Sequence, residues 1–297
     1  MKRRTFLKGT LAASFIPTVI TRNLHAHDQV PHAVWVENAE PEQLLNESLK
    51  VFGGMSAFIS PGEVVVVKPN IGWDRAPQFA ATTNPDLIKA IVRSCYEAGA
   101  KKVLVFDHTC NNPRRCYKNS KIAELAESVD AEVIQVRKNR YENLTIADGK
   151  LIDQWPIYQD YLEADKIINV PIAKHHSLCR VTLGMKNLMG VMGGNRGSLH
   201  SDFDIKLIDI VSKIMPDLTI IDGYRILTSN GPVGGNVDDV VLKRTLIVSP
   251  CLVSADYLAL DLFNLDVKEV GYLKEALARG ISKYDVKRLQ VQRINLA

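Results

Sequence analysis

The chain has 297 residues, with 37 basic and 33 acidic side chains, a formal net charge of +4 and 46% hydrophobic residues. Five of the basic residues lie in positions 1–26, which contain no acid, so the remainder carries 32 basic residues against 33 acidic ones. This balance and the lack of a basic run exclude a nucleic-acid-binding footprint. Residues 27–297 are long enough to enclose a sizeable hydrophobic core.

The first 26 residues have the layout of a twin-arginine export signal. Arg3 and Arg4 precede Thr-Phe-Leu-Lys, residues 9–20 are mildly apolar, and residues 24–26 (Leu-His-Ala) offer a small-residue cleavage site. The apolar run is shorter than the about 20 residues that span a bilayer, so we expect no stable membrane anchor. The alternative is a basic N-terminus on a cytosolic helix. We expect the twin-arginine translocon to export the folded protein to the periplasm, which also suggests a cofactor loaded beforehand.

The strands and helices expected from residue 63 to residue 136 alternate along the chain. Residues 63–68 (Glu-Val-Val-Val-Val-Lys) are typical of a strand buried on both faces. Asn84-Pro85-Asp86 predicts the start of a helix, whose apolar stripe continues to a stop at Gly99. After it we expect a strand at 102–107, a helix at 120–128 and a strand at 132–136.

The second half continues the alternation. We expect strands at 166–170, 218–222 and 245–249, and helices at 178–189, 204–214, 255–263 and 267–279. Ser254 or Asp256 is expected to cap the helix that follows it. The pattern predicts one α/β domain over residues 27–297, a mostly parallel sheet flanked by helices on both faces, as in a Rossmann-like three-layer sandwich.

The five cysteines carry no metal-binding spacing. None forms a Cys-x-x-Cys pair, so we expect neither an iron–sulfur cluster nor a zinc ribbon. The number is odd, so at least one thiol stays free or pairs between chains. Cys110 and Cys116 could bridge in an oxidising compartment, although the loop between them is short.

Polar residues follow each expected strand, and ligands of open parallel sheets bind beyond the carboxyl ends of the strands. These segments are Lys68-Pro69-Asn70, Asp107-His108-Thr109, the run from Pro171 to Lys174-His175-His176, Asp222-Gly223 and Ser249-Pro250. If all five strands are parallel, Lys68, Asp107, Lys174 and Asp222 surround one cavity. The alternative for any single segment is a solvated turn.

Residues 174–200 hold the densest set of chemically useful side chains, including three of the seven histidines. Imidazoles suit acid–base work and metal binding, because their pKa lies near neutrality. Lys174 and Lys186 can hold an anion, or one can be a nucleophile if desolvated. The glycines of the segment let the backbone approach a ligand, but they form no nucleotide-binding fingerprint. The alternative is a flexible polar loop.

Several motifs together resemble the family called domain of unknown function 362. They are Val-Lys-Pro-Asn at 67–70, Lys174-x-His176, Lys186-Asn187-Leu-Met-Gly190, His200, Asp222-Gly223 and Ser254-Ala-Asp256. Many members carry added ferredoxin cysteines, which this chain lacks. His175 stands where the family has a small residue, which suggests an additional ligand or a shifted role.

The order and spacing of His176, Lys186 and His200 also resemble, more distantly, the lactate racemase group. Those enzymes carry a nickel pincer cofactor joined to a lysine. The resemblance implies that Lys186 holds the cofactor, that His200 binds the metal, and that His108 and His176 are the two proton-transfer bases.

We therefore expect an enzyme of unassigned reaction that acts on a small anionic or hydroxylated molecule, with a metal or cofactor as one option. The expected catalytic residues are His108, His176 and Lys174. The residues expected to bind a cofactor or ligand are Lys68, Asn70, Lys186, Asn187, Arg196 and Asp222, and those expected to bind a metal are His200 and His175. The alternatives are a periplasmic binding or accessory protein without catalysis, and a racemase or epimerase of a 2-hydroxy acid.

Export is directly testable. Changing Arg3 and Arg4 together to Lys should leave the precursor in the cytoplasm, because the twin-arginine pair is the feature that defines this signal. Fractionation followed by immunoblotting measures the outcome. A periplasmic yield equal to that of the unchanged protein would contradict the assignment.

Overall fold

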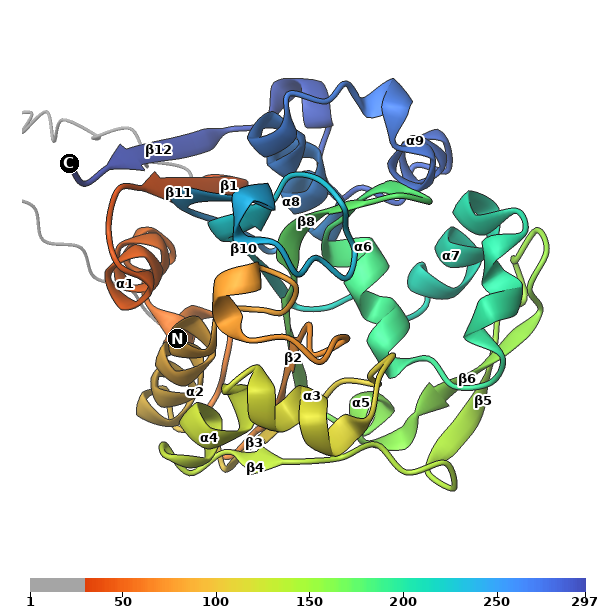
Figure 1. The fold of residues 1–297 in the computed structure, drawn as a ribbon, viewed down its shortest axis with the longest axis horizontal. Coiled ribbons are helices and arrows are strands. Elements are labelled where there is room, and N and C mark those ends of the chain that lie inside the picture. Colours follow the sequence, from red (N-terminus) through yellow and green to blue (C-terminus); the bar gives the residue numbers. More distant parts are fainter. Residues whose placement is uncertain (1–29) are drawn as a thin grey trace, which may run out of the picture.

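The computed structural model describes residues 30–297 (Figure 1). The expected export signal, residues 1–26, lies outside the described residues. Within the described part, no helix combines the length and apolar character needed to cross a membrane. The strands are β1 (Ala33–Glu37), β2 (Val64–Pro69), β3 (Lys102–Val105), β4 (Glu132–Val133), β5 (Tyr141–Thr145), β6 (Gln154–Tyr158), β7 (Lys166–Val170), β8 (Ile172–His176), β9 (Arg180–Thr182), β10 (Leu218–Leu227), β11 (Val240–Ser249) and β12 (Val291–Asn295).

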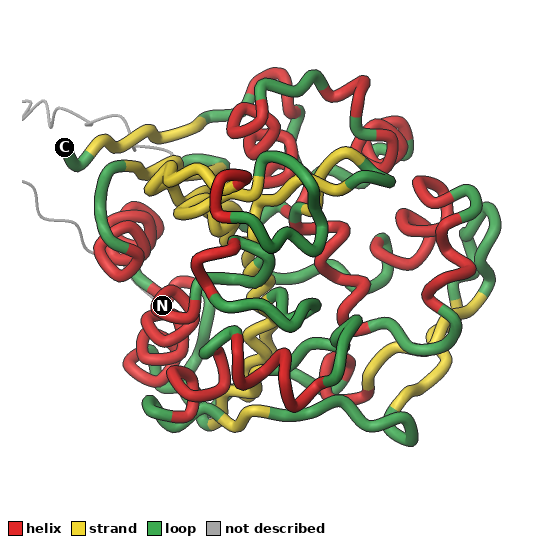
Figure 2. Tube along the Cα trace, viewed as in Figure 1, coloured by secondary structure: helices red, strands yellow, loops and turns green. Residues whose placement is uncertain are grey.

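Helices alternate with these strands along much of the chain, as Figure 2 shows by colour. They are α1 (Pro41–Phe52), α2 (Pro85–Glu97), α3 (Pro113–Asn119), α4 (Ile122–Glu127), α5 (Gln159–Leu162), α6 (Gly184–Asn187), α7 (Phe203–Val211), α8 (Leu252–Ala259) and α9 (Gly271–Ala278). The expected start of α2 is confirmed, since the Asn84 side chain accepts a hydrogen bond from the Asp86 N–H at 3.1 Å.

The main sheet has ten strands, in the order β12-β1-β11-β10-β7-β2-β3-β4, with β8 and β9 attached beside β10. Neighbours from β10 to β4 run parallel, whereas β11 is antiparallel to both β1 and β10. The α/β fold with a mostly parallel sheet is therefore confirmed. The expectation that 245–249 is parallel to the others is wrong, because Ser249 pairs with Thr219 at the beginning of β10.

Alternate residues of the central strands enter two hydrophobic layers. In β2, Val65 and Val67 face the layer that includes α1, α2 and α4, whereas Val66 faces the layer that includes α6 to α9. Residues of β3 alternate in the same way, with Leu104 on the second side. Because side chains alternate across a pleated strand, an uninterrupted apolar run is what a strand covered on both faces needs. The helices on both sides of the sheet are visible in Figure 1.

The expected helix at 178–189 is wrong in its first half and confirmed in its second, where a short α-helix (Gly184–Asn187) continues into a 3-10 turn (Leu188–Val191). Arg180 has a positive φ of 68° and residues 180–182 pair with β8 as strand β9, so helix α6 begins only at Gly184. The start of α6 is fixed by Asp256, whose carboxylate accepts hydrogen bonds from the N–H groups of Gly184 (2.6 Å) and Met185 (2.9 Å). Asp256 and Ser254 lie inside α8, so neither caps it as expected.

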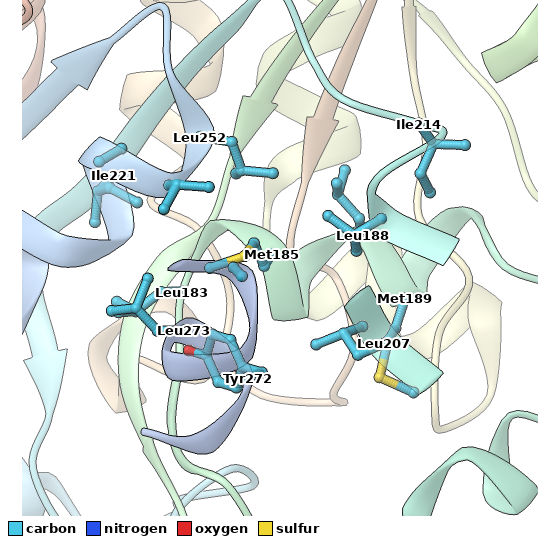
Figure 3. Packing of buried hydrophobic residues seen from close by; sticks show 14 of the residues in the cluster. Leu183, Met185, Leu188, Met189, Leu207, Ile214, Ile221, Leu252, Tyr272 and Leu273 are labelled. Atoms are coloured by element: carbon cyan, nitrogen blue, oxygen red, sulfur yellow. The ribbon is translucent and has the colours of Figure 1, made fainter. Parts of the chain in front are cut away.

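The short α6 is anchored by its apolar side. Figure 3 shows Met185 and Leu188 within a cluster that includes Leu207 of α7 and Leu252 of α8. This packing leaves the polar residues of α6 free to face the ends of the parallel strands. Beyond the main sheet, β5 and β6 form a separate two-stranded sheet, which the sequence patterns did not predict.

Candidate functional site

A cavity of about 570 Å³ lies at the carboxyl ends of the parallel strands, a size typical of small-molecule sites. Six basic or imidazole side chains contribute to its wall: His108, Lys174, His176, Lys186, Arg196 and His200. They come from the segment after β3, from β8, from α6 and from the loop that follows it. The structure therefore brings together most of the residues expected to form the site.

A buried ion pair forms the floor of this cavity. Lys68 at the end of β2 and Asp107 just after β3 are almost fully buried, and the Lys68 Nζ lies 2.7 Å from the Asp107 Oδ1. The other oxygen of Asp107 accepts the Ile71 N–H at 2.6 Å. Lys68 also donates to its neighbouring Pro69 carbonyl and, at 3.2 Å, to Asn187 Oδ1. Burial lowers the pKa of Lys68, and the Asp107 carboxylate opposes that shift.

Gly190 packs directly over this pair. A Cβ at this position would overlap the Asp107 carboxylate and the Lys68 ammonium, so only glycine fits without a rearrangement. The Gly190 carbonyl also accepts the His108 N–H at 2.8 Å. We expected this glycine to let the backbone approach a ligand, but the groups that it approaches closely are Lys68 and Asp107 of the protein itself.

Two amides connect the ion pair to the cavity wall. Asn187 of α6 donates to Asn169 Oδ1 at 2.9 Å, and its Oδ1 accepts the Asn70 Nδ2 at 3.1 Å. Asn70 Oδ1 in turn accepts from the Lys174 Nζ at 3.3 Å. Asn70 and Asn187 are therefore committed to the network that holds strand ends and α6 together, with Asn70 also exposed to the cavity.

Lys174 is a buried lysine without an acidic partner in residues 30–297. Its ammonium donates to the Ala81 carbonyl at 2.5 Å and to Asn70, which are both neutral acceptors. Burial lowers the pKa of Lys174 to about 7, and Lys186 contributes to the lowering through charge repulsion. The charge of Lys174 thus changes in the physiological pH range.

Lys186 and Arg196 also lack carboxylate partners within residues 30–297. The Lys186 Nζ lies 3.0 Å from Met189 Sδ and 5.2 Å from the centre of the Phe203 ring. Burial lowers the pKa of Lys186. Arg196 donates to the carbonyls of His108 (3.0 Å) and Thr109 (3.2 Å).

The two histidines expected to be bases are held in opposite tautomers. His108 Nδ1 lies 3.0 Å from the Met192 carbonyl, which can only accept, so Nδ1 carries the proton and Nε2 has the free lone pair. His176 Nδ1 instead accepts the Leu178 N–H at 3.1 Å, so its proton is on Nε2. We assign both tautomers from these hydrogen-bond partners.

Both imidazoles are electrically neutral at physiological pH. Burial and the Arg196 guanidinium lower the pKa of His108. Burial, with Lys186 and Lys174 next, lowers the pKa of His176 to about 3. Burial and Lys186 also lower the pKa of His200. The histidines therefore add hydrogen-bonding groups but no charge to the cavity.

Three expected site residues are not part of the cavity wall: Lys68, which lies beneath it in the buried pair with Asp107, and also His175 and Asp222. His175 follows the alternation of β8 and turns to the opposite side from Lys174 and His176, where its Nδ1 accepts the Gly231 N–H at 3.1 Å. Asp222 is buried and accepts the Asn84 N–H at 2.7 Å, which ties β10 to the start of α2. Burial raises the pKa of Asp222 to about 6.

Some residues of the site were not expected. Trp73 lies in the wall, and Tyr141 of β5 places its hydroxyl 3.0 Å from His108 Nδ1. Trp73 follows the Lys68-Pro69-Asn70 segment by only three residues, a proximity that could have indicated it. No local sequence signal could have indicated Tyr141, because it is brought to His108 by a distant hairpin.

The side chains near the cavity determine how a metal ion could be bound there. No group of three or more His, Cys, Asp or Glu side chains within residues 30–297 is placed to hold a metal ion. A metal here would need ligands supplied by a cofactor, with His200 as the imidazole in the wall. All five cysteines are free thiols in this structure, with Cys110 exposed and Cys116 buried.

The chain belongs to the family described as domain of unknown function (DUF362), whose model matches residues 65–261. It is similar to the thylakoid-associated protein sll1697 of Synechocystis sp., with 28% identity over 230 residues that cover 75% of this chain and 70% of that protein. Among solved structures it is similar to the lactate racemase apoprotein from Thermoanaerobacterium thermosaccharolyticum, with 12% identity and a TM-score of 0.44. That match covers 73% of this chain, which spans 54% of the racemase chain.

Because Gly190 contacts the ion pair, we expect one added methyl group at this position to lower the stability of the protein strongly. Gly190→Ala should destabilise the protein by roughly 3 kcal/mol, because the methyl group forces apart buried charged groups. Urea denaturation measures the free energy of unfolding. Gly72→Ala is the control, since its Cβ would meet Asn70 Oδ1 at an ordinary 3.4 Å. Equal stability of the two variants would contradict this account of the floor.

Proposed function

We propose that this chain is an exported enzyme that binds a small anionic molecule, such as a hydroxylated acid, and moves a proton on it. One observation carries the proposal. Three basic side chains that have no carboxylate partner in the described part of the chain line the same cavity as two neutral imidazoles in opposite tautomers. Export rests on the Arg3-Arg4 signal layout.

The charge of the cavity favours an anion. Asp107 is the one acid in the wall among the described residues, and Lys68 already neutralises it at 2.7 Å. Lys174, Lys186 and Arg196 are therefore uncompensated. Buried cations are costly without a counter-charge, so a carboxylate or phosphate in this cavity would recover part of that cost.

The tautomers assign the histidines different parts in proton transfer. The free lone pair on His108 Nε2 can accept a proton from a substrate carbon or hydroxyl group. The Nε2–H of His176 can donate a hydrogen bond to an oxygen on which negative charge develops, as a neutral imidazole does when its pKa is lowered. The two residues thus act as a base and a donor, instead of as two equivalent bases.

A racemase or epimerase of a 2-hydroxy acid is a second candidate, because His108, His176, Lys186 and His200 share one wall. Lys186 would hold a lysine-linked cofactor and His200 its metal ion. When bound, that group would supply hydride acceptance. His108 would take the hydroxyl proton, and Arg196 would orient the carboxylate.

Histidine variants separate an enzyme from a binding protein. With protein purified from its own periplasm, NMR should detect turnover or deuterium exchange of a member of a panel of 2-hydroxy acids. His108→Gln should slow the reaction about 100-fold or more, because it removes the base. His175→Gln is the control, since that imidazole lies outside the cavity.

An enzyme and a binding protein without catalysis would give different results in this assay. If the panel binds but no member reacts or exchanges in the unchanged protein, the chain is a binding protein. If His108→Gln and His175→Gln are equally active, His108 is not the base.

The pKa of Lys174 predicts how anion binding depends on pH. A lysine with a pKa of about 7 is a cation below that pH and neutral above it. The affinity for malonate, whose two carboxylates are ionised in this range, should therefore fall by roughly tenfold between pH 6 and pH 9. Isothermal titration calorimetry measures it. Lys174→Met should bind malonate more weakly, and its affinity should not fall between pH 6 and pH 9. If the affinity of this variant falls as much as that of the unchanged protein, Lys174 is not the group that titrates.

A further inference from the structure

A second cavity, of about 700 Å³, adjoins the first and is not used by the proposed function. The two share four wall residues: Asp107, His108, Thr109 and Gly194. The rest of the second wall comes from Gly193, the start of α3, the loop after β4 and the β5–β6 hairpin. The segment that carries His108 therefore borders both cavities.

His108 is fixed from the side of the second cavity. Its Nδ1 lies 3.0 Å from the hydroxyl of Tyr141, which is a wall residue of that cavity and is absent from the wall of the first. The backbone of Gly193 and Gly194 passes close to Tyr141 and Pro156, which brings the hairpin against the same loop. A ligand placed at His108 and longer than the first cavity would extend toward this hairpin.

The wall of the second cavity, as the described residues form it, combines apolar surface with one unpaired lysine. Pro113, Val136, Tyr141 and Pro156 supply carbon surface. Lys138 is exposed and forms no ion pair with an acid of residues 30–297. Asp107, paired with Lys68, is the one acid that the described residues contribute to this wall. An apolar chain with a terminal negative charge complements this surface.

The geometry points to an elongated acid as the substrate class. Its anionic head lies among Lys186, Arg196 and Lys174, the reacting atom is at His108, and an apolar chain of several carbons fills the second cavity. A second carboxylate at the end of that chain pairs with Lys138. This inference rests on the proposed function, because it takes the first cavity as the anion site.

A series of dicarboxylates tests the inference without knowledge of the natural substrate. Binding of malonate, adipate and suberate to the full chain is measured by isothermal titration calorimetry. Affinity should rise by about fourfold for each methylene group buried in the second cavity. Val136→Trp, which narrows that cavity with a bulky ring, should reduce the gain for suberate and leave malonate unchanged.

A second variant, which changes charge instead of volume, tests the inference even if Val136→Trp fails to fold. Lys138→Glu should weaken suberate binding roughly fivefold relative to malonate, because it replaces an attraction at the far end of the ligand with a repulsion. Leu151→Trp and Lys243→Glu are the matched controls at exposed positions outside both walls. They should leave both affinities unchanged.

The outcomes separate this inference from the function on which it rests. If malonate binds but suberate binds no more tightly, or if Val136→Trp weakens both equally, the elongated substrate is overturned and the anion site stands. Simultaneous binding of malonate and suberate would also overturn it, since the second cavity would then be an independent site. If malonate fails to bind the unchanged protein, the proposed anion site fails as well.

Discussion

The buried pair of Lys68 and Asp107 is the constraint on which the rest of the site depends. Removing two charges from water is costly, and their attraction repays that cost only when the remaining hydrogen-bonding groups are also satisfied. Here the Ile71 N–H, the Pro69 carbonyl and the Asn187 amide satisfy them. The pair therefore fixes the ends of β2 and β3 and also requires α6 to dock where its amide can reach.

The same pair determines the charge of the cavity. Because Lys68 neutralises Asp107 from below, Lys174, Lys186 and Arg196 have no carboxylate partner of their own among the described residues. Their repulsion and burial then keep the neighbouring imidazoles neutral. A wall that combines cations with neutral imidazoles thus lies above one ion pair placed beneath the cavity.

Local signals predicted part of this arrangement from the sequence. The apolar run before Lys68 and the Asn84 cap define β2 and α2, because strand burial and helix capping are set by adjacent residues. The start of α6 was missed, since Asp256 fixes it from 72 positions away. His175 was assigned to the site because β8 was not expected, and its alternation would have excluded that residue.

The position of His108 shows how stability and chemistry are connected. Its backbone N–H is held by the Gly190 carbonyl, and its Nδ1 is held by the Met192 carbonyl, two residues further along the same segment. Gly190 in turn rests on the ion pair. The tautomer that leaves Nε2 free therefore depends on packing against Lys68 and Asp107, so we expect a change in the floor of the cavity to alter His108, the proposed base.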